Sequence, residues 1–346
     1  MPGKKKKHIL VIRLSAMGDV AMIVPILRAL TLQYPKVRIT VVSRASYQPF
    51  FEGMKQVSFF AADVDGKHKG FLGLLQLYRE LKALHITHVA DLHNVLRSKI
   101  ITTLFSLRGK KTATTDKARA EKKALTRPDN KVFIPLLPVP QRHAEVFKKL
   151  GLPIDLTSPV FPEKKEINER LLEVTGGKTA KWIGIAPFAQ HRSKIYPHDL
   201  MRIVIDYLAK KEYKLFLFGG GKAEAEVMHS FANNRENIVV MAGKTNLKGE
   251  MELISNLDLM VSMDSGNAHI AAMLGIKVVS LWGATHPYAG YGAFNQPLDN
   301  ALVSEREQYP MLPTSVYGNK KIVGYEDAMR TITPESVIAK IEEVLQ

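Results

Sequence analysis

"HILVIRLSAMGDVAMIVPILRALTLQYPKVRITVVS", residues 8–43, contains two apolar runs separated by a helical pattern. The first run (8–14) leads into the turn SAMGD, and the second (38–43) follows a helix-like stretch at 20–35. Two apolar strands joined by a helix form a βαβ unit, in which the strands pair in parallel and are covered on both faces. The stretch therefore predicts an open α/β sheet with parallel strands for the first half of the chain.

A similar alternation of strand and helix patterns resumes after residues 151–180, a stretch with several prolines and a charged helical segment. The apolar runs of this second half are KWIGIAPF, YKLFLFGGG, NIVVMAG, LDLMVSMDSG and KVVSLWGAT. A chain of 346 residues exceeds what one core usually supports. We therefore predict two α/β domains, residues 1–165 and 166–333, and a closing helix at 334–346 for which packing on the first domain is one option.

The charge balance is strongly basic, with a formal net charge of +16 and a pI near 9.7. Such a chain attracts anionic partners over long range, and nucleic acid, an anionic membrane surface and a phosphorylated substrate all meet that description. Basic residues are dense at 109–131, which we predict to be a long loop or lid. They are also dense at Lys4–Lys7, which we interpret as a solvated tail, with membrane or nucleic-acid contact as the alternative.

The chain has no cysteine, which excludes disulfides, thiolate metal ligands and a thiol nucleophile and fits a reducing compartment. His85, His88 and His93 lack the carboxylate spacing of a zinc site, so no metal is predicted. The apolar stretch near the start is interrupted by Arg13 and Asp19, whereas a membrane-spanning helix needs about 20 largely apolar residues. We expect no secretory signal and a cytoplasmic location.

Two segments of the first half could line a cleft. In RLSAMGDV (13–20), Gly18 allows close backbone approach and Asp19 stands near a helix start, where a carboxylate is electrostatically favoured. A plain helix cap and a general base are both consistent with this placement of the aspartate. The segment DLHNVLRSK offers His93 and Arg97, although a helix with one polar face has the same pattern.

Two loops of the second half have the composition of phosphate sites. In APFAQHRSKIYPHDL (186–200), Arg192 and Lys194 precede a helix start, a place suited to gripping a diphosphate, and a solvated basic loop is the alternative. LFLFGGGKAEAEV (215–227) brings backbone N–H groups near a phosphate or ribose, but it lacks the spacing of a dinucleotide fold and the ending of a P-loop. The candidates in this second loop are Gly219, Gly220 and Glu224.

The strongest signal is MDSGNAHIAAMLG, residues 263–275, which follows an apolar strand. Ser265 and Gly266 offer a hydroxyl and a bare backbone to a phosphate at the start of a helix. A lone histidine at such a place is more often structural, but Asp264 and His269 together with the serine favour a binding site.

These motifs, taken together, resemble the lipopolysaccharide heptosyltransferase family, glycosyltransferase family 9. The resemblance rests on ILVIRLSAMGDVAMIVPILRAL, SKIYP and MDSGNAHIAAMLGIKVVSLWGATHP, and RHAEVFKKLGLP and AGKTNLKGEMELISNLDLMVSMDSG are further collinear pieces. It implies the GT-B architecture, two Rossmann-like domains with a cleft between them. Tyr196 stands where tryptophan is common, and Asn267 and Ala268 where relatives more often have other pairs; neither change removes a charge or the glycine.

The resemblance also implies inverting transfer of heptose from ADP-heptose to a lipopolysaccharide inner-core acceptor, Kdo-lipid A or a heptosyl core, with no cofactor and no obligatory metal. Asp19 falls on the family's catalytic aspartate, which deprotonates the acceptor hydroxyl, and Lys194 on the lysine that neutralises the leaving diphosphate. The donor-side candidates are Gly18, Arg192, Gly219, Gly220, Glu224, Asp264, Ser265, Gly266 and His269.

An anionic acceptor at the inner face of a membrane would concentrate a basic enzyme there, so we expect peripheral membrane association and no nucleic-acid partner. We expect the basic segment 109–131 to contact the acceptor. The acceptor-side candidates are His93, Arg97, Lys117 and Arg119.

Three other functions remain open from the sequence. A basic nucleic-acid- or membrane-binding protein without catalysis would explain the charge, but aromatic residues make up only 8% and no nucleic-acid motif is present. A related nucleotide-sugar enzyme with another donor, such as an epimerase, would share the architecture. A family member that has lost activity would serve as a scaffold, and the presence of Asp19 argues against it.

Overall fold

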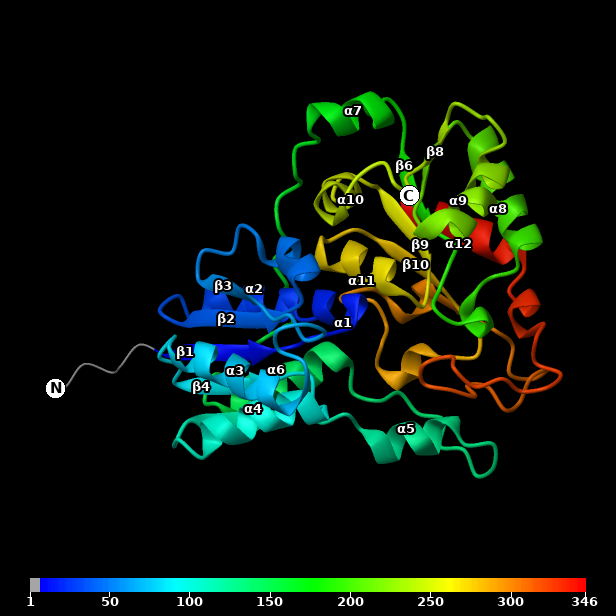
Figure 1. Cartoon of the computed structure of the whole chain (residues 1–346). Coiled ribbons are helices and arrows are strands. Elements are labelled where there is room, and N and C mark those ends of the chain that lie inside the picture. Colours follow the sequence, from blue (N-terminus) through cyan, green and yellow to red (C-terminus); the bar gives the residue numbers. More distant parts are fainter. Residues whose placement is uncertain (1–6) are drawn as a thin grey trace. The chain divides into compact units, whose positions relative to one another are not determined.

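The computed structural model describes residues 7–346, which form two compact units (Figure 1). The first unit comprises residues 7–117 and 139–161, and the second comprises 118–138 and 162–346. The interpretation of the tail at Lys4–Lys7 falls, except for its last residue, outside the described part. None of the helices in residues 7–346 is long and apolar enough to span a membrane.

The first unit is built on a sheet of parallel strands. Its strands are β1 (His8–Ile12), β2 (Arg38–Ser43), β3 (Val57–Ala61), β4 (His88–Asp91) and β5 (Lys111–Thr114). They lie in the order β3-β2-β1-β4-β5, so β1 is central. Every residue of β1 is buried, as expected for a strand that is covered on both faces.

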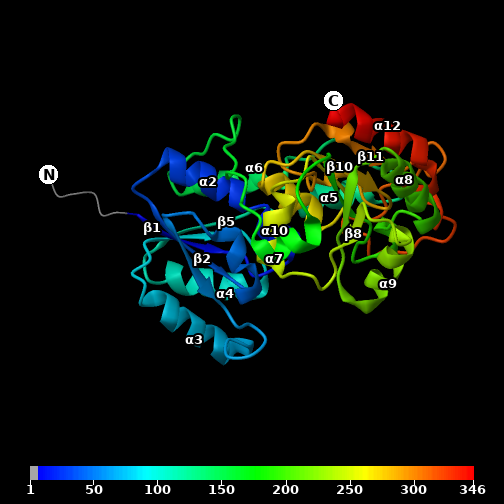
Figure 2. The ribbon, with the colours of Figure 1, turned by 90° about the horizontal axis from the view of Figure 1, so that it is seen from above.

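Helices cover both faces of this first sheet. They are α1 (Met17–Ala21), α2 (Val24–Gln33), α3 (Gly70–Lys82), α4 (Leu96–Ser106) and α6 (Val139–Lys149). Figure 2 shows α2 and α6 on one side of the strands and α3 and α4 on the other. Leu10 and Ile12 of β1 pack with Leu77 of α3 and Phe105 of α4, which shows the two-residue alternation of a strand serving two faces.

The single helix predicted at 20–35 is wrong, because the chain forms α1 and α2 with a break at residues 22–23. Pro25 lies in the first turn of α2. Proline lacks the N–H that a helix interior needs, but it is tolerated in the first turn, where that group has no intrahelical partner. The apolar periodicity continues through the break, which is why the pattern suggested one helix.

The second unit contains a larger parallel sheet. Its strands are β6 (Trp182–Ala186), β7 (Lys214–Leu217), β8 (Ile238–Val240), β9 (Leu259–Met263), β10 (Val278–Trp282) and β11 (Ala301–Val303). They lie in the order β11-β10-β9-β6-β7-β8. The five apolar runs predicted as strands are confirmed as β6 to β10, whereas β11, like β3 in the first unit, was not predicted.

The helices of the second unit are α5 (Arg119–Thr126), α7 (Glu169–Thr175), α8 (His198–Lys210), α9 (Gly221–Ala232), α10 (Leu247–Ile254), α11 (Gly266–Met273) and α12 (Pro334–Leu345). The closing helix α12 packs on α8 and buries Val337, Ile341 and Leu345 in the core of this unit. It therefore belongs to the second unit, in contrast to the option that placed it on the first domain.

Residues 118–138 differ most from the sequence-based expectation. The stretch 109–131, predicted as a loop or lid, forms β5 and α5, and its part from residue 118 onward belongs to the second unit although it precedes the expected boundary at 165. Lys122 is buried on α5 with its Nζ 4.2 Å from the centroid of the Tyr291 ring. A lysine whose stem is buried counts as polar in a sequence pattern, so the helical periodicity was not visible.

The strand order reverses beside the first strand of each sheet. β1 lies between β2 and β4, and β6 lies between β7 and β9. In open α/β sheets, ligands bind beyond the carboxyl ends of the strands at such a reversal. The loops that follow β1 and β4 in the first unit, and β6 and β9 in the second, are therefore where sites are expected.

Candidate functional site

In the first unit, Asp19 lies in the first turn of α1, and the segment between β1 and this helix holds its side chain in place. The Oδ2 of Asp19 accepts a hydrogen bond from the backbone N–H of Ala16 at 3.2 Å and forms an ion pair with the Arg13 guanidinium. Arg13 is 8% exposed, and its Nη1 donates to the carbonyl of Leu92 at 2.7 Å. The aspartate thus caps its own helix, while 26% of its side chain stays accessible.

The loop after β4 is organised around a buried carboxylate. Asp91 Oδ1 accepts hydrogen bonds from the backbone N–H groups of His93 and Asn94 at 2.9 and 2.8 Å, and Oδ2 accepts one from the Ser98 hydroxyl at 3.0 Å. Asp91 is fully buried. This network fixes the turn, and it brings Nδ1 of His93 within 3.4 Å of the backbone N–H of Leu14.

The imidazole of His93 is kept neutral by its surroundings. Burial lowers the pKa of His93 to about 3, and the positive charges of Arg13 and Lys117 act in the same direction. Asp19 and Arg97 are close enough to influence the same pKa. The structure therefore brings together the predicted base and three of the four acceptor-side candidates.

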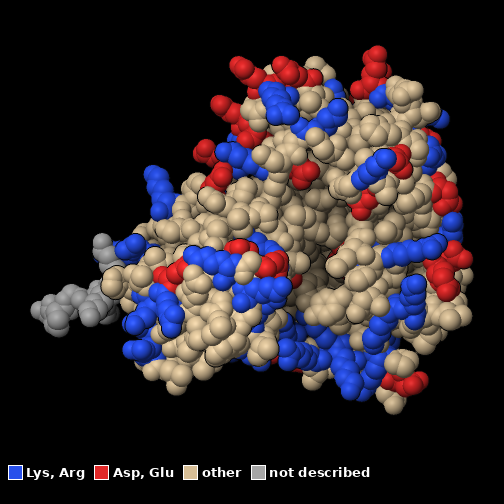
Figure 3. All heavy atoms as spheres, viewed as in Figure 1, with Lys and Arg blue, Asp and Glu red and all other residues tan. Residues whose placement is uncertain are grey.

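Arg119, the fourth acceptor-side candidate, is exposed on α5 in the second unit. Figure 3 shows Lys and Arg side chains gathered over the region of α5, where Arg119, Lys123 and Arg127 are exposed. Gly18, predicted on the donor side, lies in α1 of the first unit beside Asp19.

In the second unit, the loops after β6 and β9 place Lys194 against Asp264. The Lys194 Nζ lies 2.9 Å from Asp264 Oδ2, and the two side chains are only 12% and 10% exposed. The hydroxyl of Thr285, in the loop after β10, donates to the same carboxylate oxygen at 2.8 Å. A buried charge pair needs such additional hydrogen bonds to satisfy its remaining atoms.

The stem of Lys194 is held by close packing. Gly318 has a φ of +80°, and a Cβ at this position would come within 2.5 Å of Lys194 Cδ. The Ser193 hydroxyl donates to the Gly318 carbonyl at 2.7 Å, and the Ala284 N–H donates to the Ser193 carbonyl at 3.0 Å. The short helical turn Arg192–Lys194 is thereby tied to the segments after β10 and near residue 318.

The amino end of α11 lies directly after Asp264. Ser265 is its N-cap residue and Gly266 its first residue, and the Ser265 hydroxyl lies 3.1 Å from that of Ser262. His269, one turn into the helix, is 8% exposed. Free backbone N–H groups and the helix dipole make such an end attractive to anions, and the nearby ammonium of Lys194 adds a full positive charge.

Glu224 stabilises the glycine-rich loop after β7, because its Oε2 accepts a hydrogen bond from the Gly220 N–H at 2.7 Å. A Cβ on Gly219 would come within 2.8 Å of Met228 Cε and 3.1 Å of the Phe188 ring, in the loop after β6, so a larger residue would require these side chains to shift. Arg192 is exposed at the start of its turn. The glycines and Glu224 lie next to the loop that carries Lys194. None of these donor-side candidates is among the residues that hold Asp264, so the structure does not assign them a role.

Tyr196 is fully buried and points into the core rather than toward the site. Its hydroxyl donates to the Ile332 carbonyl at 2.7 Å, and burial raises its pKa. The tyrosine therefore anchors the loop after β6 to the segment that precedes α12.

Sequence reasoning did not assign a function to Arg13, Thr285 or Gly318. Arg13 and Thr285 lie inside the quoted motifs RLSAMGDV and WGATHP. Membership of a motif was therefore the one feature of the sequence that could have identified them. Gly318 lies outside every motif, and only its contact with Lys194 identifies it.

Within residues 7–346, no group of three or more His, Asp or Glu side chains is arranged to hold a metal ion. The sequence has no cysteine to add to such a group.

Comparison with known proteins identifies relatives along most of the chain. Residues 74–320 match the model of glycosyltransferase family 9 (heptosyltransferase). Lipooligosaccharide heptosyltransferase 2 of Haemophilus influenzae is 32% identical over 169 residues, and the match spans 47% of this chain and 47% of that protein. The chain thus spans about half the length of this curated relative.

Two solved structures align over nearly the whole chain. The glycosyl transferase family 9 structure from Veillonella parvula aligns with a TM-score of 0.75 at 23% identity, covering 99% of this chain and 98% of that one. The E. coli heptosyltransferase WaaC with ADP aligns with a TM-score of 0.68 at 19% identity, covering 97% and 99%. At these identities the alignments show the fold, and they confirm the predicted GT-B class with its two parallel α/β sheets.

Proposed function

Since this chain belongs to glycosyltransferase family 9, the heptosyltransferases, we propose that it transfers heptose from ADP-heptose to an inner-core lipopolysaccharide acceptor. One observation carries the proposal. The residues that the family resemblance assigns to the chemistry each lie beyond the carboxyl end of the strand at which their sheet reverses its order, Asp19 in the first turn of α1 and Lys194 in the loop after β6. The ADP in the aligned WaaC structure supports an ADP-linked donor.

The reaction is a single displacement with inversion. The Asp19 carboxylate takes the proton of the acceptor hydroxyl while that oxygen forms a bond to the anomeric carbon of the heptose. The bond from the anomeric carbon to the diphosphate oxygen breaks, and ADP leaves with the electron pair. Lys194 and the amino end of α11 stabilise the charge that develops on the diphosphate.

Arg13 and Asp264 hold the two reacting groups in place. Arg13 is anchored to the Leu92 carbonyl, so it orients the base without itself needing to touch substrate. Asp264 holds the Lys194 ammonium in the absence of donor, because it is itself fixed by Thr285. On donor binding the ammonium is shared between this carboxylate and the diphosphate.

The acceptor is anionic, and the cationic groups around His93 suit it. Arg97 and Lys117 lie near the neutral imidazole in the same unit as Asp19. With a net charge of +16, the protein acts peripherally at the inner face of the cytoplasmic membrane, where its acceptor is displayed. The reaction needs no cofactor and no nucleic-acid partner.

The test measures ADP release from ADP-heptose with and without deacylated lipopolysaccharide core, for the wild-type chain and Asp19→Ala. We expect release that requires the acceptor and collapses in the variant, while ADP binding is retained. Conversion of the donor without an acceptor would instead indicate an epimerase. Binding of random DNA without ADP binding would overturn the proposal in favour of a nucleic-acid-binding protein.

A further inference from the structure

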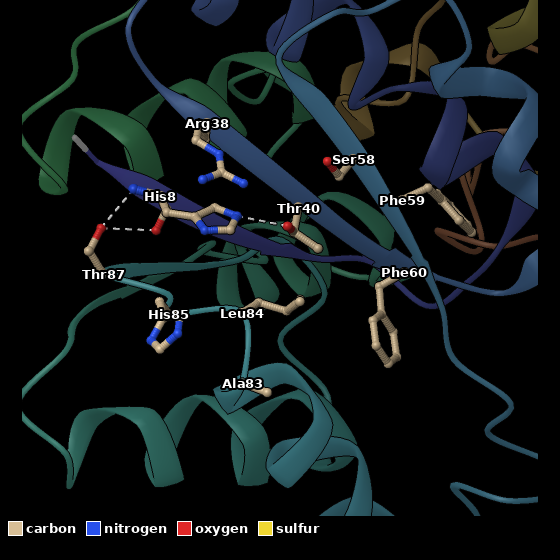
Figure 4. A pocket seen from close by; sticks show the side chains of 10 residues that line it. All are labelled: His8, Arg38, Thr40, Ser58, Phe59, Phe60, Ala83, Leu84, His85 and Thr87. Carbon is tan, nitrogen blue, oxygen red and sulfur yellow. Dashed lines mark hydrogen bonds between the residues drawn. The ribbon is translucent and has the colours of Figure 1, made fainter.

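The first unit contains a cavity at the end of the sheet where β1 and β2 begin, whereas Asp19 lies beyond the opposite end of β1. The cavity has a volume of about 630 Å³ (Figure 4). The residues that line it come from β1, β2, β3 and the segment 83–87. His8 and Arg38 begin β1 and β2, whereas Asp19 follows the other end of β1. The cavity is therefore separate from the site described above, and its volume lies in the range of small-molecule sites.

Hydrogen bonds between separate segments fix one wall of this cavity. The Nε2 of His8 lies 2.8 Å from the Thr40 hydroxyl on the neighbouring strand, and both side chains are buried, at 8% and 3% exposure. The Thr87 hydroxyl accepts a hydrogen bond from the His8 N–H at 2.9 Å and lies 3.0 Å from the His8 carbonyl. The wall is thus formed before any ligand arrives.

The charge in this cavity has one sign. Arg38 is the permanently charged residue among those that line it, and none of them is acidic. Within residues 7–346 no carboxylate lies within 4.0 Å of the Arg38 guanidinium. A guanidinium presents donors that match the oxygens of a carboxylate or phosphate, and no carboxylate among the described residues is paired with these donors.

The opposite part of the cavity is apolar. The ring of Phe60 and the side chains of Leu84 and Ala83 lie on the side away from Arg38 (Figure 4). Phe60 also packs against the core between the sheet, α3 and α4, so its ring is held in place. A cavity with a cation at one side and an aromatic wall at the other fits an amphipathic ligand better than an inorganic ion.

We propose that this cavity binds a small organic anion, a phosphate or carboxylate on an aromatic body. Arg38 holds the anionic group, the exposed hydroxyl of Ser58 adds a hydrogen bond, and Phe60 and Leu84 cover the aromatic body. This site is independent of the proposed transfer reaction, because it uses none of the residues assigned to it.

The test is calorimetric titration of the full chain with phenyl phosphate and with benzoate, and with inorganic phosphate and phenol as comparators. We expect saturable binding of one equivalent of an amphipathic probe, with both comparators weaker. Arg38→Gln is expected to weaken binding about tenfold or more, because it removes a charge-assisted hydrogen bond. Lys36→Gln, an exposed change two residues away, is the matched control and is expected to bind normally.

Two further variants make the result decisive. Ser58→Asp places a carboxylate at an exposed lining position and is expected to abolish binding without disturbing the core. Lys194→Ala tests whether the probe occupies the phosphate-binding region of the second unit instead. Loss of binding in Lys194→Ala with normal binding in Arg38→Gln overturns the proposal, and so does the absence of saturable binding by either probe.

Discussion

The two units hold the charges to which we assign the proposed reaction by opposite arrangements. In the first, a carboxylate that is 26% accessible, Asp19, is held by Arg13, whose side chain is 9% accessible. In the second, the Lys194 ammonium is held by the carboxylate of Asp264, and both side chains are at most 12% accessible. The group that supports the reacting charge is anchored in each case, to the Leu92 carbonyl in the first and by the Thr285 hydroxyl in the second.

The difference in accessibility agrees with what the proposed reaction requires of each site. A base has to meet a hydroxyl that arrives from water, so part of its side chain must stay open. A cation that stabilises a leaving diphosphate acts more strongly where water is excluded, because charges interact more strongly there. The comparison predicts that substitutions in the first unit act mainly on the chemical step, whereas those in the second also affect donor binding and folding.

The largest effect is expected from Asp19→Asn, which keeps the shape of the side chain but removes the base. We expect kcat to fall by about 10³-fold, within the range for loss of a general base, with ADP affinity unchanged. Steady-state kinetics and ADP titration check this, with Asp129→Asn, an exposed carboxylate, as the control. If Asp19→Asn keeps the wild-type kcat, Asp19 is not the base, and the proposed division into a basic group in the first unit and a cation in the second fails.

The next effect is expected from Lys194→Met, alone and combined with Asp264→Asn. Loss of the ammonium should lower kcat by about 10²-fold and weaken ADP binding. It also leaves Asp264 buried without its partner, which should cost about 3 kcal/mol of unfolding free energy, and the double variant should recover part of that loss. Urea unfolding of the wild type, the single variants and the double variant measures these differences in unfolding free energy. If the single variant is as stable as wild type, the pair is not a buried one in solution.

Thr285→Val sharpens the comparison at the anchoring residue. It removes the hydroxyl that binds Asp264 but keeps the side-chain volume, so donor affinity should fall about tenfold, as for loss of a hydrogen bond to a charged group. Thr285→Ser keeps the hydroxyl and should restore most of the affinity. Normal affinity in the valine variant with reduced affinity in the serine variant would show that packing by the methyl group, rather than the hydrogen bond, is what matters.

Gly318→Ala probes the stem of Lys194 from the other side. A Cβ at this position would displace the lysine methylenes, and the positive φ adds strain for any residue other than glycine. We expect a several-fold rise in the KM for the donor with the KM for the acceptor unchanged. The neighbouring Asn319→Ala serves as the control, and an equal loss in both variants would point to the loop rather than to the lysine.

The predictable part of the molecule is the part with local periodicity. β1, β2 and the second-unit strands β6 to β10 were visible because a buried parallel strand is a continuous apolar run. The strand β11 has residues of intermediate burial only, so it is not a continuous apolar run. In α5 one of the buried positions is Lys122, which a sequence pattern counts as polar. The candidate charges were visible as motifs, but Arg13 and Thr285 became functional candidates only when tertiary contacts showed which carboxylate each one holds.

The smallest effect concerns His93 and separates stability from catalysis in the first unit. The pKa of His93 is about 3 in the folded protein and near 6.5 when unfolded, so the unfolded chain binds more protons between these values. Stability is therefore fully present above about pH 6.5 and is lost as the pH falls toward 3, by at most about 1.4 kcal/mol per pH unit from this group. His93→Gln removes this contribution, so its unfolding free energy should depend less on pH between 7 and 5.

Urea unfolding at both pH values measures the slope, with His229→Gln, an exposed histidine, as the control. An unchanged slope would mean that His93 takes up a proton as readily in the folded protein, and the cluster around Asp19 would then carry an additional positive charge at pH 5.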